Sequence, residues 1–229
     1  VAGALITPGH PDHARPGHGA ARATAHTLAI MKIRMGEGFA GTTQAARLGE
    51  TVDVNGVRVT FFPAGHVLGS AQISVEWQGL RIVVSGDYKL KADPTAETFE
   101  PIPCDVFITE ATFGLPVFRH PDPAAEIAAL IASARAFAHR SDLVGVYALG
   151  KAQRVARLLV DNGWDRPVFI HGALKEISDY YEASGIGLGD LRPATVEHAK
   201  AGDFAGAIVL GPPSSFQSPW VRRFPDPVI

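Results

Sequence analysis

The sequence predicts an α/β protein whose two halves are built differently. Up to Gly114, short strand patterns end at polar side chains, whereas later strands alternate with helices. Such alternation is typical of βαβ units and a mostly parallel sheet. Of the 229 residues, 46% are hydrophobic and 19% are charged, so the chain can bury a substantial core and is not of the disordered class.

The first half is predicted to be rich in strands. Residues 4–7 form a short apolar strand, and residues 24–34 have helical spacing with Thr24 as the cap. Asn55-Gly56, between apolar runs at 52–54 and 57–62, is a strong hairpin signal. Polar and apolar residues alternate over residues 73–77, and apolar runs predict buried strands over 80–85 and 106–109.

The second half is predicted to alternate helices and strands. Asp122 and Pro123 begin a long helix that runs to about residue 138. Strands are expected over residues 143–149, 168–170 and 207–210, and helices over 152–160 and 173–182. The segment Gly114–Pro121 is the best boundary between two domains.

Composition restricts the class of partner and compartment. The net charge of −2 gives no support to nucleic-acid binding, although a local basic groove stays compatible with it. The single cysteine, Cys104, allows no disulfide framework, which favours a cytoplasmic location, and makes a zinc–thiolate site improbable. No apolar run reaches membrane-spanning length, and no signal peptide precedes the first motif. Both ends are expected to be cut from a longer protein.

Five side chains of metal-ligand type follow three of the predicted strands. His10, Asp12 and His13 fall within one stretch of four residues directly after the first strand, His66 follows the second strand and Asp87 the third. Imidazole nitrogen and carboxylate oxygen both bind zinc at roughly 2.0–2.2 Å. If the three strand ends share one edge of a sheet, the five side chains converge on a metal centre.

Two divalent ions, zinc or alternatively manganese, suit this set. Ions roughly 3.5–4 Å apart clamp the attacking and leaving oxygens of a phosphodiester and make hydroxide available near neutral pH. Asp87 is the natural bridging ligand, because a carboxylate can serve two cations. Taken alone, His66 is more often a structural histidine. The histidines in loop or helix-surface contexts are interpreted as structural: His18, His26, His120, His139 and His198.

These motifs resemble the metallo-β-lactamase superfamily and, within it, the branch of the β-CASP nucleases. Within that branch they are most similar to the bacterial exonucleases associated with DNA ligases, which are related to the nucleases that process mRNA 3′ ends. The residues that carry the resemblance are Thr7-Pro8-Gly9-His10-Pro11-Asp12-His13, Gly65-His66, Ser85-Gly86-Asp87, Thr109-Glu110-Ala111-Thr112-Phe113-Gly114 and Ala148-Leu149-Gly150-Lys151-Ala152-Gln153. The resemblance implies an incomplete αββα fold over residues 1–115, an inserted α/β cassette over 116–223, and the start of the return to the first domain over 224–229.

The resemblance also implies roles for the site residues. His10 and His66 would bind the first metal, Asp12 and His13 the second, and Asp87 would bridge them. Glu110 would lie close to the metals and orient a histidine that protonates the leaving group, so that Asp12 and Glu110 are the expected catalytic residues. The alternative for Glu110 is a solvated carboxylate at a strand end.

Two departures from the family pattern weaken the expected activity. Pro8 stands where the family has the first histidine of His-x-His-x-Asp-His, and its side chain cannot ligate a metal. The family's later metal-binding and catalytic histidines would lie beyond Ile229, and the strand that should precede Val1 is missing. We therefore expect a weakened or inactive enzyme, with the first metal site affected most.

Three functions remain open. The first is a metal-dependent DNA exonuclease in repair, with RNA as an alternative substrate and with an ATP-dependent DNA ligase and a helicase as partners. Lys151 and His171 are its candidate phosphate contacts, although ordinary turn chemistry also explains both residues. The second, a small-molecule metallohydrolase, is disfavoured by the Glu110 motif and the cassette. The third, a catalytically dead binding module, is favoured by Pro8 and opposed by the retained ligands.

Overall fold

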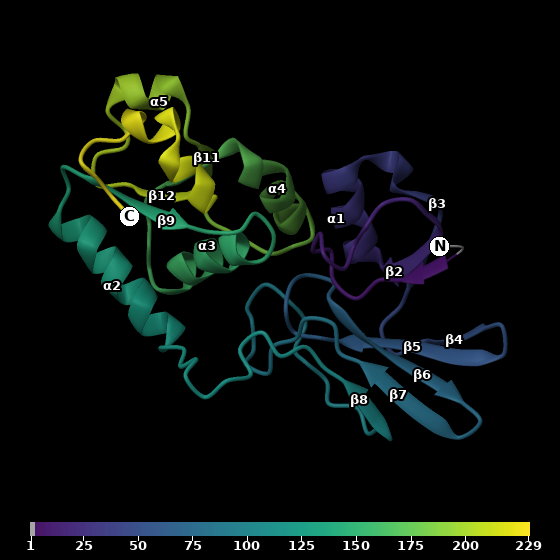
Figure 1. Cartoon of the computed structure of the whole chain (residues 1–229). Coiled ribbons are helices and arrows are strands. Elements are labelled where there is room, and N and C mark those ends of the chain that lie inside the picture. The colour runs from purple at the N-terminus through teal and green to yellow at the C-terminus, as the bar shows by residue number, and fades with distance from the viewer. Residues whose placement is uncertain (1–2) are drawn as a thin grey trace. The chain divides into compact units, whose positions relative to one another are not determined.

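The computed structural model describes residues 3–229. The chain divides into two compact units, Val1–Phe118 and Arg119–Ile229, each described by itself (Figure 1). Both units combine helices and strands, which confirms the predicted α/β class. Within residues 3–229, every helix is too short or too polar to cross a membrane.

The first unit contains two sheets, a three-stranded parallel one ordered β1-β2-β3 and a five-stranded one ordered β4-β5-β6-β7-β8. The second sheet is antiparallel except between β7 and β8. The elements of the first unit are β1 (Gly3–Leu5), β2 (His18–Thr24), α1 (Ala25–Met35), η1 (Glu37–Phe39), β3 (Ala40–Ala46), β4 (Thr51–Val54), β5 (Val57–Pro63), β6 (Ala71–Trp77), β7 (Leu80–Val84) and β8 (Val106–Ile108). Among residues 3–118, α1 is the one α-helix, so the four-layer αββα arrangement stays a prediction.

Local signals in the first unit act as predicted. The Thr24 hydroxyl accepts a hydrogen bond from the Thr27 amide (3.2 Å) and caps α1, which then packs Met31 into the core of the first sheet. The hairpin at Asn55-Gly56 is confirmed, with φ of 54° and 83°, the left-handed values of a type I′ turn. Both features are set by neighbours in sequence.

The predicted burial of the strand at 106–109 is wrong. Val106, Phe107 and Ile108 are 43%, 43% and 53% exposed. The reason is topological: β8 is the edge strand of its sheet and pairs only with β7. Strands β2 and β3 were also missed.

Backbone contacts draw the predicted ligand loops together. The Ala71 amide at the start of β6 donates to the Thr7 carbonyl (3.0 Å), which ties the loop after β1 to the end of the loop after β5. A Cβ on Gly86, where φ is 57°, would lie 2.5 Å from the Thr7 Cβ. Glycine at this position therefore lets the segment after β7 approach the same loop.

The second unit is built on a five-stranded parallel sheet ordered β11-β10-β12-β9-β13, as the alternation of elements predicts. Helix α3 contacts both α2 and α4 on one face, while α5 and the turns η3 and η4 cover the other (Figure 1). The elements are α2 (Pro123–Ala136), β9 (Ser141–Gly145), α3 (Lys151–Asp161), β10 (Val168–Ile170), η2 (Gly172–Leu174), α4 (Lys175–Ala183), β11 (Leu191–Pro193), α5 (Val196–Ala201), β12 (Ile208–Gly211), η3 (Pro213–Gln217), η4 (Pro219–Arg223) and β13 (Pro227–Val228).

Two predicted elements end or begin differently in the structure. The strand expected over 143–149 ends at Gly145, and the helix expected from residue 173 begins as the 3-10 turn η2 before α4. Strand β11 and helix α5 were not predicted. The core on the α5 side gathers Leu143, Phe169 and Val209 from three strands, which fixes the sheet by packing rather than by local pattern.

Candidate metal centre

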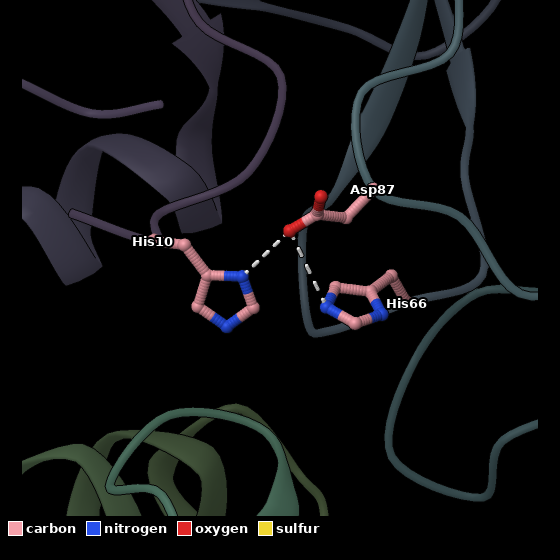
Figure 2. Close-up of side chains that lie close together, drawn as sticks. All are labelled: His10, His66 and Asp87. Atoms are coloured by element: carbon pink, nitrogen blue, oxygen red, sulfur yellow. Dashed lines mark hydrogen bonds and ion pairs between the residues drawn. The ribbon is translucent and has the colours of Figure 1, made fainter. Parts of the chain in front are cut away.

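Asp87 lies between three imidazoles in the first unit. His10 Nδ1 lies 3.0 Å and His66 Nε2 lies 3.6 Å from Asp87 Oδ2, while His13 Nε2 lies 3.1 Å from Asp87 Oδ1. Figure 2 shows His10 and His66 turned toward the same carboxylate oxygen. The two oxygens of one carboxylate thus face two different sets of ligand-type side chains.

The loop after β1 is shaped to present two of these imidazoles. The amides of His13 and Ala14 both donate to the His10 carbonyl (3.1 and 2.7 Å), which closes a turn and brings His10 and His13 to the same side. The Thr7 hydroxyl lies 3.2 Å from His13 Nδ1, and Arg34 at the end of α1 donates to the Gly9 carbonyl (2.8 Å). The second nitrogen of His13 is therefore held while Nε2 points at Asp87.

The loop after β5 holds His66 by its backbone. The amides of His66 and Val67 both donate to the Ser70 hydroxyl (3.0 and 3.1 Å). This compact turn leaves the imidazole free to face Asp87.

The donor set fits a divalent ion. The ligand atoms of His10, His66 and Asp87 all lie within 4.8 Å of one another. In a tetrahedral zinc site with bonds of roughly 2.0–2.1 Å, neighbouring ligand atoms are about 3.3 Å apart, close to the 3.0 and 3.6 Å that separate Asp87 Oδ2 from the nitrogens of His10 and His66. These three residues could therefore hold one ion. Asp12 Oδ2 lies 3.5 Å from His13 Nε2, but its side chain is 74% exposed, and Pro8 adds no ligand atom.

The charges of the centre suit metal binding. Burial, followed by the positive charge of His10, lowers the pKa of His66 to about 4; Lys89 lowers it further, while Asp87 and Glu110 act in the opposite direction. The hydrogen bond from His10 lowers the pKa of Asp87 below its ordinary value, against burial, which raises it. Near neutral pH, His66 is therefore uncharged and Asp87 ionised, the forms that ligate metals.

Glu110 lies beside this centre. Its amide faces the Ser85 hydroxyl at 3.4 Å, two residues before Asp87, and its Oε2 accepts a hydrogen bond from the Thr112 amide (2.7 Å). Its charge raises the pKa of His66. The predicted ligands and the predicted acidic residue thus meet in one unit.

Lys151 and His171 belong to the second unit. Lys151 is the exposed first residue of α3, after Gly150, whose φ is 85°. His171 accepts the Ala173 amide at Nδ1 (3.1 Å) and packs edge-on against Trp220, with ring centroids 4.9 Å apart.

Three supporting residues were missed from the sequence. Thr7 lies inside the quoted motif but was not assigned a role, and Arg34 gives no local signal because it acts from the far end of a helix. Lys89 forms an ion pair with the buried Asp93 and acts electrostatically on His66. Only its position two residues after Asp87 could have suggested it.

Comparisons with known proteins identify relatives of this chain. No protein-family model matches it. The endoribonuclease ysh1 of Aspergillus fumigatus is 38% identical over 143 residues, 58% of this chain and 16% of the relative. A probable DNA ligase of Opitutus terrae is 30% identical over 229 residues, 96% of this chain and 21% of the relative. The chain belongs to the β-CASP nuclease branch of the metallo-β-lactamase superfamily.

This β-CASP chain spans about a sixth to a fifth of the length of those relatives. The endoribonuclease YSH1 of Saccharomyces cerevisiae is 38% identical over 119 residues, 51% of this chain and 15% of the relative. The crystal structure of a protein of unknown function from Enterococcus faecalis matches 91% of this β-CASP chain and 58% of that protein, with a TM-score of 0.59 and 13% identity. That likeness supports the fold.

Proposed function

We propose that the chain is a metal-dependent phosphodiesterase that acts on nucleic acid. The observation that carries the proposal is Asp87, whose Oδ2 faces His10 and His66 and whose Oδ1 faces His13. His10, His66 and Asp87 would hold one ion, and Asp12 and His13 would hold a second beside the other oxygen. Zinc and manganese both accept these ligands.

When bound, such ions supply Lewis acidity toward a phosphoryl oxygen and a nucleophile at neutral pH. The residues of the chain supply the rest. Asp87 keeps its negative charge between the imidazoles, and His66 stays neutral. Asp12 and Glu110 are the proposed catalytic residues. Glu110, whose charge raises the pKa of His66, would orient a histidine that protonates the leaving group.

The proposed domain assignment follows the family. Residues 1–115 would be the metallo-β-lactamase-like domain, 116–223 the β-CASP-like cassette, and 224–229 the start of the return. The parallel sheet of the second unit supports a cassette of α/β type. Lys151 at the first turn of α3 and His171 after β10 are proposed to hold substrate phosphates.

DNA is the favoured substrate, in an exonuclease that works in repair with a DNA ligase. The support is the alignment of 96% of this chain with a probable DNA ligase. RNA is the second candidate, because the relatives aligned over 58% and 51% of the chain are named endoribonucleases. Nothing in the comparisons supports the expected helicase partner. The cytoplasmic location remains a proposal based on the single cysteine.

The test combines metal analysis with cleavage assays. The chain is stripped of metal, dialysed against zinc or manganese, and given single-stranded DNA, double-stranded DNA and RNA labelled at either end. We expect up to two ions per chain, with the first site the weaker because of Pro8, and slow cleavage that chelation stops. Asp87→Asn should lower both metal content and rate, the rate by about 100-fold or more. Glu50→Gln, an exposed carboxylate outside the centre, is the matched control.

Three outcomes separate the candidates. Metal-loaded Pro8→His protein that leaves all three substrates intact contradicts the nuclease proposal. Hydrolysis of a thioester or lactone in its place would favour the small-molecule hydrolase. Absence of bound metal, unchanged in Pro8→His, would favour the dead binding module.

A further inference from the structure

The carboxyl edge of the parallel sheet has the geometry of a ligand site. Beyond the ends of β9 and β10, the Val146 amide donates to the Gly211 carbonyl (2.9 Å) and the His171 amide to the Leu210 carbonyl (2.8 Å), so both segments flank the end of β12. Strands β10 and β12 are neighbours in the sheet, but the chain continues from them in opposite directions. It runs from β10 to β11 on one side and from β12 to β13 on the other. Open parallel sheets bind ligands in the crevice that such diverging connections leave at their carboxyl ends.

The loops at the carboxyl edge of this sheet carry no acidic side chain. Residues 146–150, 171–174, 194–195 and 212–218 contain no Asp or Glu; Lys151 follows the first of them, and Glu176 and Glu197 lie in the first turns of α4 and α5. At the amino edge, an aspartate lies within or near the start of every strand: Asp142, Asp165, Asp190, Asp203 and Asp226. Arg140 and Arg192 form ion pairs with two of these aspartates, so the difference between the edges is that the loops of the carboxyl edge place no carboxylate in the path of a polyanion.

Tyr147 presents its ring at this edge without a packing role. It lies two residues beyond the end of β9, and its side chain is 71% exposed. Its carbonyl accepts the Ala152 amide (3.2 Å) in the first turn of α3, so the backbone that carries the ring is held. Within residues 3–229 no other aromatic ring lies against it. An exposed ring four residues before Lys151, the first residue of α3, combines a stacking surface with a cation.

We infer that Tyr147 is a stacking platform for a base of single-stranded nucleic acid, whose phosphates lie along Lys151 and His171 at the carboxyl edge of this sheet. The inference rests on the proposed function and adds the form of the substrate. Proteins that bind single strands without sequence preference combine aromatic platforms with cationic grooves in this way.

Spacing and hydrogen-bond chemistry agree with a strand of one or two nucleotides across this edge. Strands β9 and β10 flank β12, so their ends are separated by two strand spacings, roughly 9–10 Å. His171 Nδ1 accepts the Ala173 amide, so the ring hydrogen lies on Nε2 and is available to a phosphate oxygen. Burial and then the charge of Arg223 hold the pKa of His171 below its ordinary value, which keeps this neutral donor form near pH 7.

The test measures binding by fluorescence anisotropy in EDTA, so that cleavage does not interfere. The probes are a labelled twelve-residue oligothymidylate and a strand of the same length with abasic sites. Wild-type chain should bind the first about tenfold more tightly. Tyr147→Leu should bind both equally, at the affinity of the abasic strand, whereas Tyr147→Phe keeps the ring and should match wild type. Trp77→Leu removes an exposed aromatic of the first unit and is the control.

A phosphate contact gives a different signature. Lys151→Gln should weaken the binding of both strands by the same factor, and it should reduce the slope of log K against log salt by about 0.7. If Tyr147→Leu binds oligothymidylate as tightly as wild type, the stacking inference is overturned, and metal-dependent cleavage by the same protein would leave the proposed function standing. If wild-type chain binds neither strand, the stacking inference is likewise overturned, and metal-dependent cleavage again decides the proposed function.

Discussion

Protonation of His66 gives a quantitative test of the metal centre in the metal-free chain. Burial and the neighbouring His10 lower the pKa of His66 from 6.5 to about 4. The unfolded chain therefore takes up this proton first as the pH falls, so the unfolding free energy of the first unit is complete above about pH 6.5 and decreases toward pH 4. The gap between the two pKa values corresponds to roughly 3 kcal/mol.

The assay is an NMR titration of the His66 imidazole in metal-free, ¹³C-labelled protein, with urea unfolding of first-unit resonances at pH 7 and pH 5. Two variants test the cause. His10→Gln removes the charge that lowers the pKa of His66 and should raise it, whereas Asp87→Asn removes a carboxylate that raises it and should lower it. A wild-type midpoint of 6 or above would refute the reasoning, because burial would then not control the ring.

Three further substitutions test the framework of the two units. Asp93→Asn removes a buried carboxylate paired with Lys89 and should cost the first unit about 3 kcal/mol in urea unfolding at pH 7. Burial raises the pKa of Asp93, but its hydrogen bonds together outweigh burial and hold the pKa below its ordinary value. This contribution to stability is therefore lost as the pH falls below about 4. Gly86→Ala places a Cβ 2.5 Å from the Thr7 Cβ and should weaken zinc binding at least about tenfold in a chelator-competition titration. Gln153→Leu removes three hydrogen bonds of a fully buried amide and should cost the second unit about 2–4 kcal/mol by thermal unfolding.

Each of these substitutions has a control that changes the same chemistry elsewhere. Asp161→Asn breaks a surface pair with Arg157 and should change stability by less than about 1 kcal/mol. Gly79 also has a positive φ (82°) but open space around it, so Gly79→Ala should leave zinc affinity intact. Gln217→Leu changes an exposed amide. Equal effects in a substitution and its control would contradict the structural argument for that site.

Sequence reasoning succeeded where the signal is local. Strands β5 and β10, the Asn55-Gly56 hairpin, and the caps at Thr24 and Asp122 depend on neighbouring residues, and the structure shows all of them. Strands β2 and β3 have the sequences HGAARAT and AGTTQAA, whose alanine and glycine carry little strand preference. They form because they pair with each other and because α1 covers them, which are tertiary causes.

The candidate site divides in the same way. Ligand-type residues at strand ends could be predicted, since loops after strands carry such groups. The support of His13 by Thr7 and the hold of Arg34 on Gly9 join residues whose relation depends on the folded loops. The opposite orientation of the two Asp87 oxygens also depends on where three loops finally lie.

The arrangement around Asp87 has a consequence for the kinetics of cation capture. Three imidazoles already point at one anion before any cation arrives, so their rotamer entropy is lost during folding and not during binding. An incoming cation therefore meets a preorganised receptor and needs little reorganisation. Loosening any one of the loops would accordingly show first as faster cation release, well before the fold itself gives way.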